Sequence, residues 1–369
     1  MIKNAIKTEI KLFDEIESIS LDRKKILFIK PSSLGDLFHA LPAFYLILSK
    51  YPNCKIDWLV NDNLANVLEY IKKDINRIIL FDRKVLKSKH PIRGLINFVK
   101  DIRREKYDYV IDLQGLMRSS LMTFVAKSKY KYGFKDCKEK ISSIFYKQKI
   151  KVPESLFHAI EKNSYLISEV LKCEYTVPDY KIPQVENFYN EATAILKNNG
   201  ICSTKYITFA PGARWESKCW PPAFFAKVAD CLYNKIPEIK IAIIGAGCDD
   251  LIAEKIIDLC ETAKPISLTG KTGLCSLIEV LRRAEVMLTN DSGPMHISAA
   301  FRVPVFALFG PTDPDKTGPF WQWSKVYQNE TGCIKCLRRE CSIQTLECQK
   351  SILSEKVADD IVNKIKSSY

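Results

Sequence analysis

Short apolar runs alternate with amphipathic stretches along most of the chain. Runs with the length of buried strands lie at residues 25–30, 55–60, 77–82 and 107–113, and again at 206–212, 239–245, 265–270, 285–291 and 303–310. Stretches with helical periodicity separate them, as at residues 40–51, 115–127 and 157–171. Strands that alternate with helices are typical of parallel sheets with crossover helices. The pattern predicts an α/β protein with two doubly wound parallel-sheet domains.

A stretch without clear periodicity separates the two sets of strands. Residues 173–185 contain two prolines and interrupt the preceding helical pattern, so we place the domain boundary there. The first domain is predicted at residues 25–180 and the second at 181–352. Residues 1–24 are predicted to be a helical N-terminal extension, and residues 353–369 a final amphipathic helix with Ser354 as its N-cap. Two such domains create a central cleft at the carboxyl ends of their strands, where ligands bind.

One carboxylate stands in the loop after the first predicted strand. The stretch FIKPSSLGDLFHALP carries the small residues Ser33 and Gly35 and then Asp36, where a helix should begin. An aspartate there can cap the helix. It can also face the cleft as a general base. The sequence leaves both interpretations open.

A second helix start follows a strand in the other half. Asp291 stands at the end of the predicted strand, Ser292 and Gly293 follow it, and His296 lies one step inside the helix. The free N–H groups of a helix N-terminus favour an anion such as phosphate. The alternative is an ordinary capped helix without a ligand.

Two cations and two glycines follow other strands of the second half. Arg214 and Lys218 lie in the loop after residues 206–212, where cations could offset charge on a departing phosphate. Exposed loop cations more often have no such role. Gly245 and Gly247 lack the third glycine of a dinucleotide fingerprint, which disfavours a nicotinamide oxidoreductase.

The thirteen cysteines are mostly scattered, as in a reducing compartment. Four are clustered: Cys333, Cys336, Cys341 and Cys348. Their spacing fits a structural zinc or iron site with four thiolates, which leaves no open position for catalysis. Free or redox-active thiols are the alternative.

Positive charge is concentrated in one segment. The net charge is +13, and residues 71–151 hold 22 Lys and Arg against 8 Asp and Glu, a balance of +14. Such a field attracts an anionic partner such as a phosphorylated lipid, a membrane surface or a nucleic acid, unless it is only a solvated basic face. No apolar stretch approaches the roughly 20 residues that cross a bilayer, and the N-terminus lacks a secretion signal. We expect a cytoplasmic protein that does not span the membrane.

Together these segments resemble glycosyltransferase family 9, the lipopolysaccharide heptosyltransferases. The similarity extends from Lys25 to Ile352 and is carried by six segments in the family's order: ILFIKPSSLGDLFHALPA, DLQGLMRSSL, APGARWESKCWP, LTGKTGL, NDSGPMHISAA and VFALFGPTDPDKTGP.

The resemblance implies a GT-B architecture, with two Rossmann-like domains that bind the acceptor on the first and the nucleotide sugar on the second. It implies inverting transfer of heptose from ADP-heptose to the inner core of lipopolysaccharide, with no obligatory cofactor, at the inner face of the inner membrane. By position, Asp36 matches the general base and Lys218 the phosphate-binding lysine. Asp291, Ser292, Gly293 and His296 match the donor loop, and Lys271 falls in a segment near the donor. Arg214 is a further donor-side candidate from its loop. Ser33, Gly35, Arg118, Lys127 and Lys129 are acceptor-side candidates, the last three because of their charge.

This sequence departs from the family at two positions. Gly247–Cys248–Asp249 stand where some members carry a glutamate that contacts the nucleoside, and Ser292 replaces a common threonine. The cysteine cluster occurs in a subset of members. Two rival functions follow: another GT-B enzyme, such as a UDP-sugar transferase or an epimerase, and a non-catalytic nucleic-acid binder. The second lacks any recognisable nucleic-acid motif.

Overall fold

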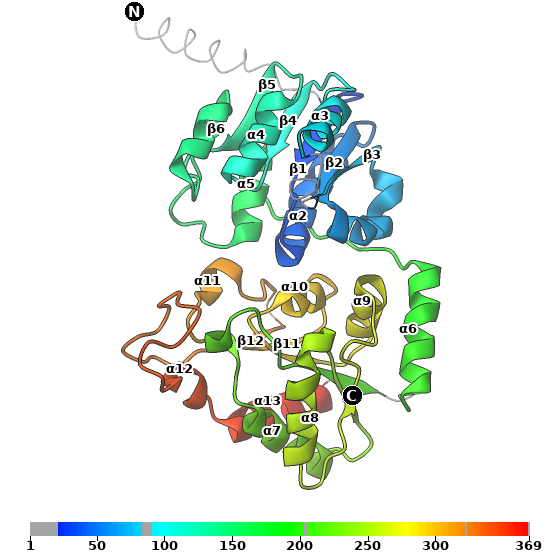
Figure 1. Ribbon diagram of the computed structural model, residues 1–369, viewed down its shortest axis with the longest axis vertical. Coiled ribbons are helices and arrows are strands. Elements are labelled where there is room, and N and C mark those ends of the chain that lie inside the picture. The colour runs from blue at the N-terminus through cyan, green and yellow to red at the C-terminus, as the bar shows by residue number, and fades with distance from the viewer. Residues whose placement is uncertain (1–20, 83, 85–90, 202–204, 322, 368–369) are drawn as a thin grey trace, which may run out of the picture.

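Two parallel sheets, one in each half of the chain, form the framework of the protein (Figure 1). The computed structural model describes residues 21–82, 84, 91–201, 205–321 and 323–367. The first sheet has the order β3-β2-β1-β4-β5-β6 and the second the order β12-β11-β10-β7-β8-β9. Counted from its own first strand, each half therefore has the same strand order, which reverses between its first and fourth strands.

The strands of the first sheet are β1 (Lys25–Ile29), β2 (Lys55–Asn61), β3 (Arg77–Phe81), β4 (Tyr109–Asp112), β5 (Tyr130–Phe134) and β6 (Gln148–Ile150). Its helices are α2 (Leu34–Lys50), α3 (Pro91–Ile102), α4 (Met117–Val125) and α5 (Ala159–Leu171), with the 3-10 segments η1 (Asp62–Asp74) and η3 (Lys140–Phe145).

The strands of the second sheet are β7 (Tyr206–Ala210), β8 (Lys240–Ile243), β9 (Ile266–Ser267), β10 (Met287–Asn290), β11 (Val305–Leu308) and β12 (Lys325–Tyr327). Its helical segments are α6 (Glu186–Asn198), η4 (Glu216–Lys218), α7 (Pro222–Lys235), η5 (Gly247–Asp249), α8 (Asp250–Leu259), α9 (Leu274–Arg282), α10 (Gly293–Ala300), α11 (Pro314–Thr317), α12 (Glu347–Lys350) and α13 (Ser354–Lys366).

Each sheet is covered by helices, which explains why its central strands read as continuous apolar runs. In the first half the rings of Phe28, Phe44 and Trp58 form one cluster, with Phe28 and Trp58 centroids 4.6 Å apart. In the second half α13 packs against α7, beside which it lies in Figure 1. The α/β fold with two doubly wound parallel sheets is therefore as the sequence predicts.

The sequence prediction differs from the structure in detail. All nine predicted strands are present, but β5, β6 and β12 were not predicted. Ser354 is the first residue of α13 and Leu353 occupies its N-cap, so the predicted cap is wrong by one position. Most of the predicted N-terminal helix, residues 1–20, lies outside the described residues.

The two halves are in direct contact along a seam. Helix α2 packs against α10, and η1 against α9. The Tyr70 hydroxyl donates to the backbone oxygen of Cys275 at 3.0 Å, and the rings of Phe38 and Phe301 are 6.3 Å apart. Within the part of the chain that the structure describes, no helix is both long and apolar enough to cross a bilayer.

Candidate active site

Three of the predicted site residues, Asp36, Lys218 and Asp291, lie at the switch points of the two sheets. Asp36 follows β1 and Gln114 follows β4, the two strands between which the first sheet reverses its order. Lys218 follows β7 and Asp291 follows β10, which flank the corresponding point in the second sheet. Ligands of open parallel sheets bind at these points, outside the carboxyl ends of the strands.

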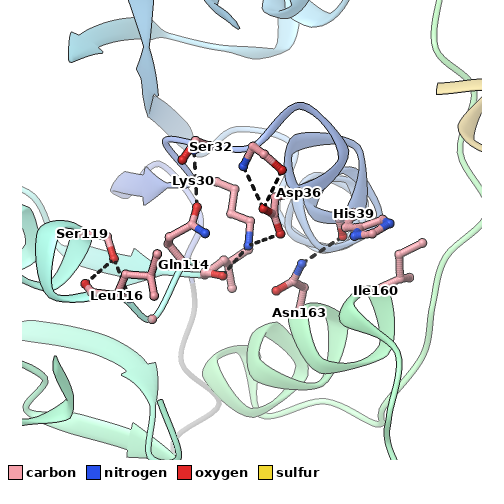
Figure 2. Close-up of polar contacts among 12 residues, drawn as sticks. Lys30, Ser32, Asp36, His39, Gln114, Leu116, Ser119, Ile160 and Asn163 are labelled. Carbon is pink, nitrogen blue, oxygen red and sulfur yellow. Dashed lines mark hydrogen bonds and ion pairs between the residues drawn. The ribbon is translucent and has the colours of Figure 1, made fainter. Parts of the chain in front are cut away.

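The Asp36 carboxylate is held by its own helix start and by a buried lysine. The backbone N–H and the hydroxyl of Ser33 both donate to Asp36 Oδ2, at 2.8 and 2.9 Å. Lys30 Nζ lies 3.7 Å from Asp36 Oδ1 and donates to the backbone oxygen of Leu113 at 2.7 Å. The Lys30 side chain is only 4% exposed, whereas that of Asp36 is 35% exposed. Figure 2 shows the two side chains pointing toward each other.

These contacts decide the protonation state of Asp36. Burial alone would raise the pKa of the carboxyl, but Lys30, the two Ser33 donors and the nearby His296 together lower the pKa below its ordinary value. Asp36 is therefore ionised at neutral pH. Ser33 is the N-cap of α2, and Asp36, at the third helical position, accepts from the Ser33 backbone N–H. Asp36 therefore stabilises the helix start and also presents a carboxylate at the seam, so the two interpretations of the sequence are compatible.

Three histidines from different elements meet behind Asp36. His39 Nε2 and His296 Nδ1 are 3.0 Å apart and join α2 to α10. The His158 ring lies 5.2 Å from that of His39, and His158 Nε2 lies 2.9 Å from the backbone oxygen of Gly318 in the second half. Asn163 donates to the His39 backbone oxygen (Figure 2). The seam beside Asp36 is thus joined by imidazoles.

The buried histidines are neutral at neutral pH. Burial, first among several causes, lowers the pKa of His296 to about 4, although the Asp291 and Asp36 carboxylates oppose this effect. Burial likewise places the pKa of His39 well below its ordinary value, with His296, His158 and Lys30 adding to the effect.

Gly35 makes the close approach of the two halves possible. A Cβ atom at this position would lie 2.2 Å from His296 Cδ2, far inside any van der Waals contact. A side chain at residue 35 would therefore push α10 and the first turn of α2 apart. This requirement explains a glycine directly before Asp36.

On the second half, Lys218 and Asp291 form a nearly buried ion pair. Lys218 Nζ lies 2.7 Å from Asp291 Oδ2, and the two side chains are 15% and 8% exposed. Thr312 Oγ1 donates to the same carboxylate oxygen at 2.7 Å, and the ammonium stands 4.5 Å from the centroid of the Trp215 ring. Ser292 is the N-cap of α10, and Gly293 is its first residue.

The turn that carries Lys218 rests on the cysteine-containing loop. The Ser217 hydroxyl donates to the backbone oxygen of Arg338 at 2.6 Å. The buried Gln349 amide donates to the backbone oxygens of Ser217 at 3.3 Å and Lys218 at 3.1 Å. The loop after β12 therefore positions the lysine, a role that the sequence did not reveal.

The four clustered cysteines are neighbours, but the expected metal site is not supported. Burial is the largest cause that raises the pKa of the Cys348 thiol. Cys333, Cys336 and Cys341 raise this pKa further, so the four thiols interact electrostatically. No group of three or more His, Cys, Asp or Glu residues among those described has a metal-holding arrangement. The thiols of all four are free.

Of the other predicted site residues, some line a cavity at the seam and others lie away from it. Arg118 and Arg214 line one cavity of about 760 Å³ together with Ser32 and Gln114. Lys271 Nζ instead donates to Asn199 Oδ1 at 2.7 Å, at the end of α6.

Lys127 and Lys129 precede β5 and so stand at the amino edge of the first sheet, opposite to Asp36. The structure does not bring these two lysines to the cavity. Their charge alone predicts an acceptor-side position for them together with Arg118.

Several residues of the site were missed in the sequence. Lys30 directly follows β1, and its buried ammonium was not distinguishable from a surface lysine in the sequence. His39 lies three residues after Asp36, a spacing that places two helical residues on neighbouring positions of one face. That spacing was the available signal. His158 and Thr312 are brought in from distant segments, and no local pattern marks them.

Comparison with known proteins assigns the chain to a family. The profile of glycosyltransferase family 9 (heptosyltransferase) matches residues 95–347. Lipopolysaccharide heptosyltransferase 1 of Pseudomonas aeruginosa is 26% identical over 90% of this chain and 91% of its own length. Lipooligosaccharide heptosyltransferase 2 of Campylobacter jejuni is 28% identical over 94% of this chain and 99% of its own length.

A solved structure has the same fold. The Escherichia coli heptosyltransferase WaaC with ADP-2-deoxy-2-fluoro heptose aligns with a TM-score of 0.66 and 25% identity, covering 90% of this chain and 99% of that one. The protein is thus a glycosyltransferase with the two-sheet GT-B architecture. It belongs to glycosyltransferase family 9, the heptosyltransferases, which confirms the resemblance noted in the sequence.

Proposed function

We propose that this enzyme transfers a heptose from ADP-heptose to the inner core of lipopolysaccharide, with inversion at the anomeric carbon. The observation that carries the proposal is the meeting of Asp36 with the Asp291–His296 segment across one seam, where His296 contacts Gly35 and His39. The names of the two relatives and the ADP-heptose analogue bound to the similar structure support the choice of donor and acceptor.

Asp36 is the general base in this proposal. It accepts the proton of the acceptor hydroxyl while that oxygen attacks the anomeric carbon from the face opposite the departing phosphate. Because Lys30 and Ser33 lower its pKa, Asp36 is a weak base that is ionised at neutral pH. Positioning of the two substrates must therefore supply much of the rate.

Lys218 and the N-terminus of α10 stabilise the leaving diphosphate. The Lys218 ammonium forms an ion pair with Asp291. It has three N–H donors, so others remain for a phosphate oxygen. The backbone N–H groups that follow Ser292 point out of the helix start, where anions are favoured. These groups compensate the negative charge that grows as the glycosidic bond breaks.

The cavity beside Asp36 receives the acceptor in this proposal. Arg118 and Arg214 line it, and both are exposed cations that suit the carboxylates and phosphates of an inner core. The strongly basic segment at residues 71–151 lies in the same half. We place the enzyme at the inner face of the inner membrane, where a lipid-anchored acceptor would be found.

Transfer to defined acceptors tests the proposal. The protein is incubated with ADP-heptose and lipopolysaccharides truncated at successive core positions, and the products are weighed by mass spectrometry. We expect a gain of one heptose on one of the truncated acceptors. Turnover of a UDP sugar with none of ADP-heptose would instead favour the rival GT-B enzymes, and duplex DNA binding without any transfer would favour the nucleic-acid binder.

A further inference from the structure

Helix α3 has an apolar face that no described part of the chain covers. Of its residues only Ile102 is buried. Ile92, Leu95 and Ile96 are 74%, 46% and 48% exposed. Residues at this spacing lie on one face of a helix, so the three side chains form a stripe in contact with solvent.

The apolar face continues onto the neighbouring elements. On α4, Leu121 and Phe124 are 46% and 60% exposed, and on η3, Ile141 and Ile144 are 58% and 61% exposed. Helix α4 packs against both α3 and η3. We call the exposed apolar side chains of α3, α4 and η3 the apolar band. Exposed apolar side chains gathered on elements that pack against one another are typical of an interaction site.

Exposed basic side chains outnumber the exposed acids beside the apolar band, which are Asp136 and Glu139 next to η3. Arg93 and Lys100 on α3 and Lys138, Lys140 and Lys147 around η3 are exposed, within the segment whose balance is +14. Apolar side chains rimmed by lysine and arginine are typical of surfaces that lie in the headgroup layer of anionic membranes. A second copy of the chain is a poor occupant, because it would bring two strongly basic surfaces together.

The apolar band borders the cavity beside Asp36. Leu95 and Leu121 line the same cavity as Ser32 and Arg214. A bilayer in contact with the band would therefore lie at the mouth of the proposed acceptor site. An acceptor sugar could enter the cavity while its lipid anchor stayed in the membrane.

We propose that the apolar band docks the enzyme on an anionic lipid bilayer and so presents the cavity to a membrane-anchored acceptor. The identity of that acceptor rests on the proposed function. The docking itself depends only on the band and on the basic side chains around it.

Vesicle flotation of the full chain, without donor or acceptor, tests the docking. The vesicles contain phosphatidylglycerol and phosphatidylethanolamine, and the variant is Ile92→Glu with Ile96→Glu. The matched control is Leu251→Glu with Leu353→Glu, which changes the charge equally at two exposed leucines, 79% and 63% exposed, of the other half. We expect about tenfold weaker vesicle binding for each aliphatic side chain removed from the band, and near wild-type binding for the control.

Three results would overturn the docking proposal. They are equal weakening in both variant pairs, failure of the wild type to float with anionic vesicles, and loss of self-association in the band variant without loss of vesicle binding. The last result would assign the band to a second copy.

Activity measurements separate this proposal from the proposed function. The band variant should keep its kcat/KM on a deacylated core oligosaccharide in solution but lose transfer to the same core embedded in vesicles. Absence of transfer to every acceptor would contradict the proposed function and leave the flotation result standing.

Discussion

Replacing Gly35 with alanine tests whether the seam positions the catalytic groups. The new methyl carbon would lie 2.2 Å from His296 Cδ2. Carbon atoms in contact are about 3.5 Å apart or more, so the ring and the first turn of α2 must separate by about 1.3 Å. Either the 3.0 Å contact between His39 and His296 breaks or Asp36 moves away from the donor side with its helix.

A displacement of this size has a large expected effect on transfer. Misplacing reacting groups by about 1 Å costs about 100-fold in rate, equivalent to about 2.7 kcal/mol in activation free energy. The first half should still fold, because alanine is favoured over glycine inside a helix by about 1 kcal/mol. We therefore expect kcat/KM for the Gly35→Ala variant to fall about 100-fold with little change in the melting temperature.

The assay is steady-state release of ADP, paired with thermal unfolding. Gly332→Ala is the control, because a Cβ there meets nothing within 4 Å. A second test compares His296→Ala with the double variant Gly35→Ala and His296→Ala. Because the clashing ring is absent from both, the additional loss of kcat/KM caused by Gly35→Ala should be small. Wild-type kcat/KM in Gly35→Ala, or an undiminished loss in the double variant, would refute the reasoning.

Four further outcomes are expected. Asp36→Asn should lower kcat by about 10²- to 10⁴-fold while the protein still folds, with a lower melting temperature because the nearly buried Lys30 ammonium loses its carboxylate partner, and near wild-type turnover would remove Asp36 from the mechanism. Lys218→Ala should raise the KM for the donor by about 10-fold or more and change the KM for the acceptor little, which initial-rate kinetics with each substrate varied will check. Gln349→Leu should destabilise the protein by about 1–3 kcal/mol in urea unfolding, because two backbone oxygens lose their buried donor, and it should also raise the donor KM. His296 binds a proton below about pH 6.5 in the unfolded state but only near pH 4 in the folded state. The free energy of unfolding should therefore fall by about 3 kcal/mol as the pH drops from 6.5 to 4. In His296→Gln the free energy of unfolding should fall by less over the same pH range.

The apolar pattern predicted the central strands well because they are buried on both faces. β1, β8 and β11 are nearly continuous apolar runs, and each was found. β6 and β12 are edge strands of three residues, and both contain lysine, so no pattern distinguished them from loops. Strand β5, YKYGF, was missed because its second position is Lys131, whose ammonium donates inside the protein to the backbone oxygen of Phe124.

The missed strand explains where Lys127 and Lys129 were placed. Charge alone assigned them to the acceptor side together with Arg118. Had β5 been recognised, the two lysines would have been seen to precede a strand, at the edge of the sheet away from the cleft. By contrast, Asp36, Lys218 and Asp291 follow strands that were predicted, and the structure has them at the switch points.

Contacts across the seam were beyond the reach of sequence patterns. His39 and His296 are 257 residues apart in the chain, and each stands in an apolar helical stretch that gives no sign of a partner. The burial of Lys30 is likewise a tertiary effect, since it depends on the backbone oxygen of Leu113, 83 residues away.

The two halves use electrostatics at different ranges. Residues 71–151 carry a balance of +14 against +13 for the whole chain, so the rest of the chain sums to −1. The first half therefore has a field that extends into solvent and attracts an anionic surface from a distance. The second half has no such excess and holds its proposed anionic donor with nearly buried groups at contact distance, Lys218 and the start of α10. Salt should weaken the long-range attraction of the first half, since exposed charges farther apart than about 8 Å are screened at physiological ionic strength. The nearly buried contacts of the second half are screened much less. This division suits one partner that is a membrane surface and another that is a small soluble nucleotide sugar.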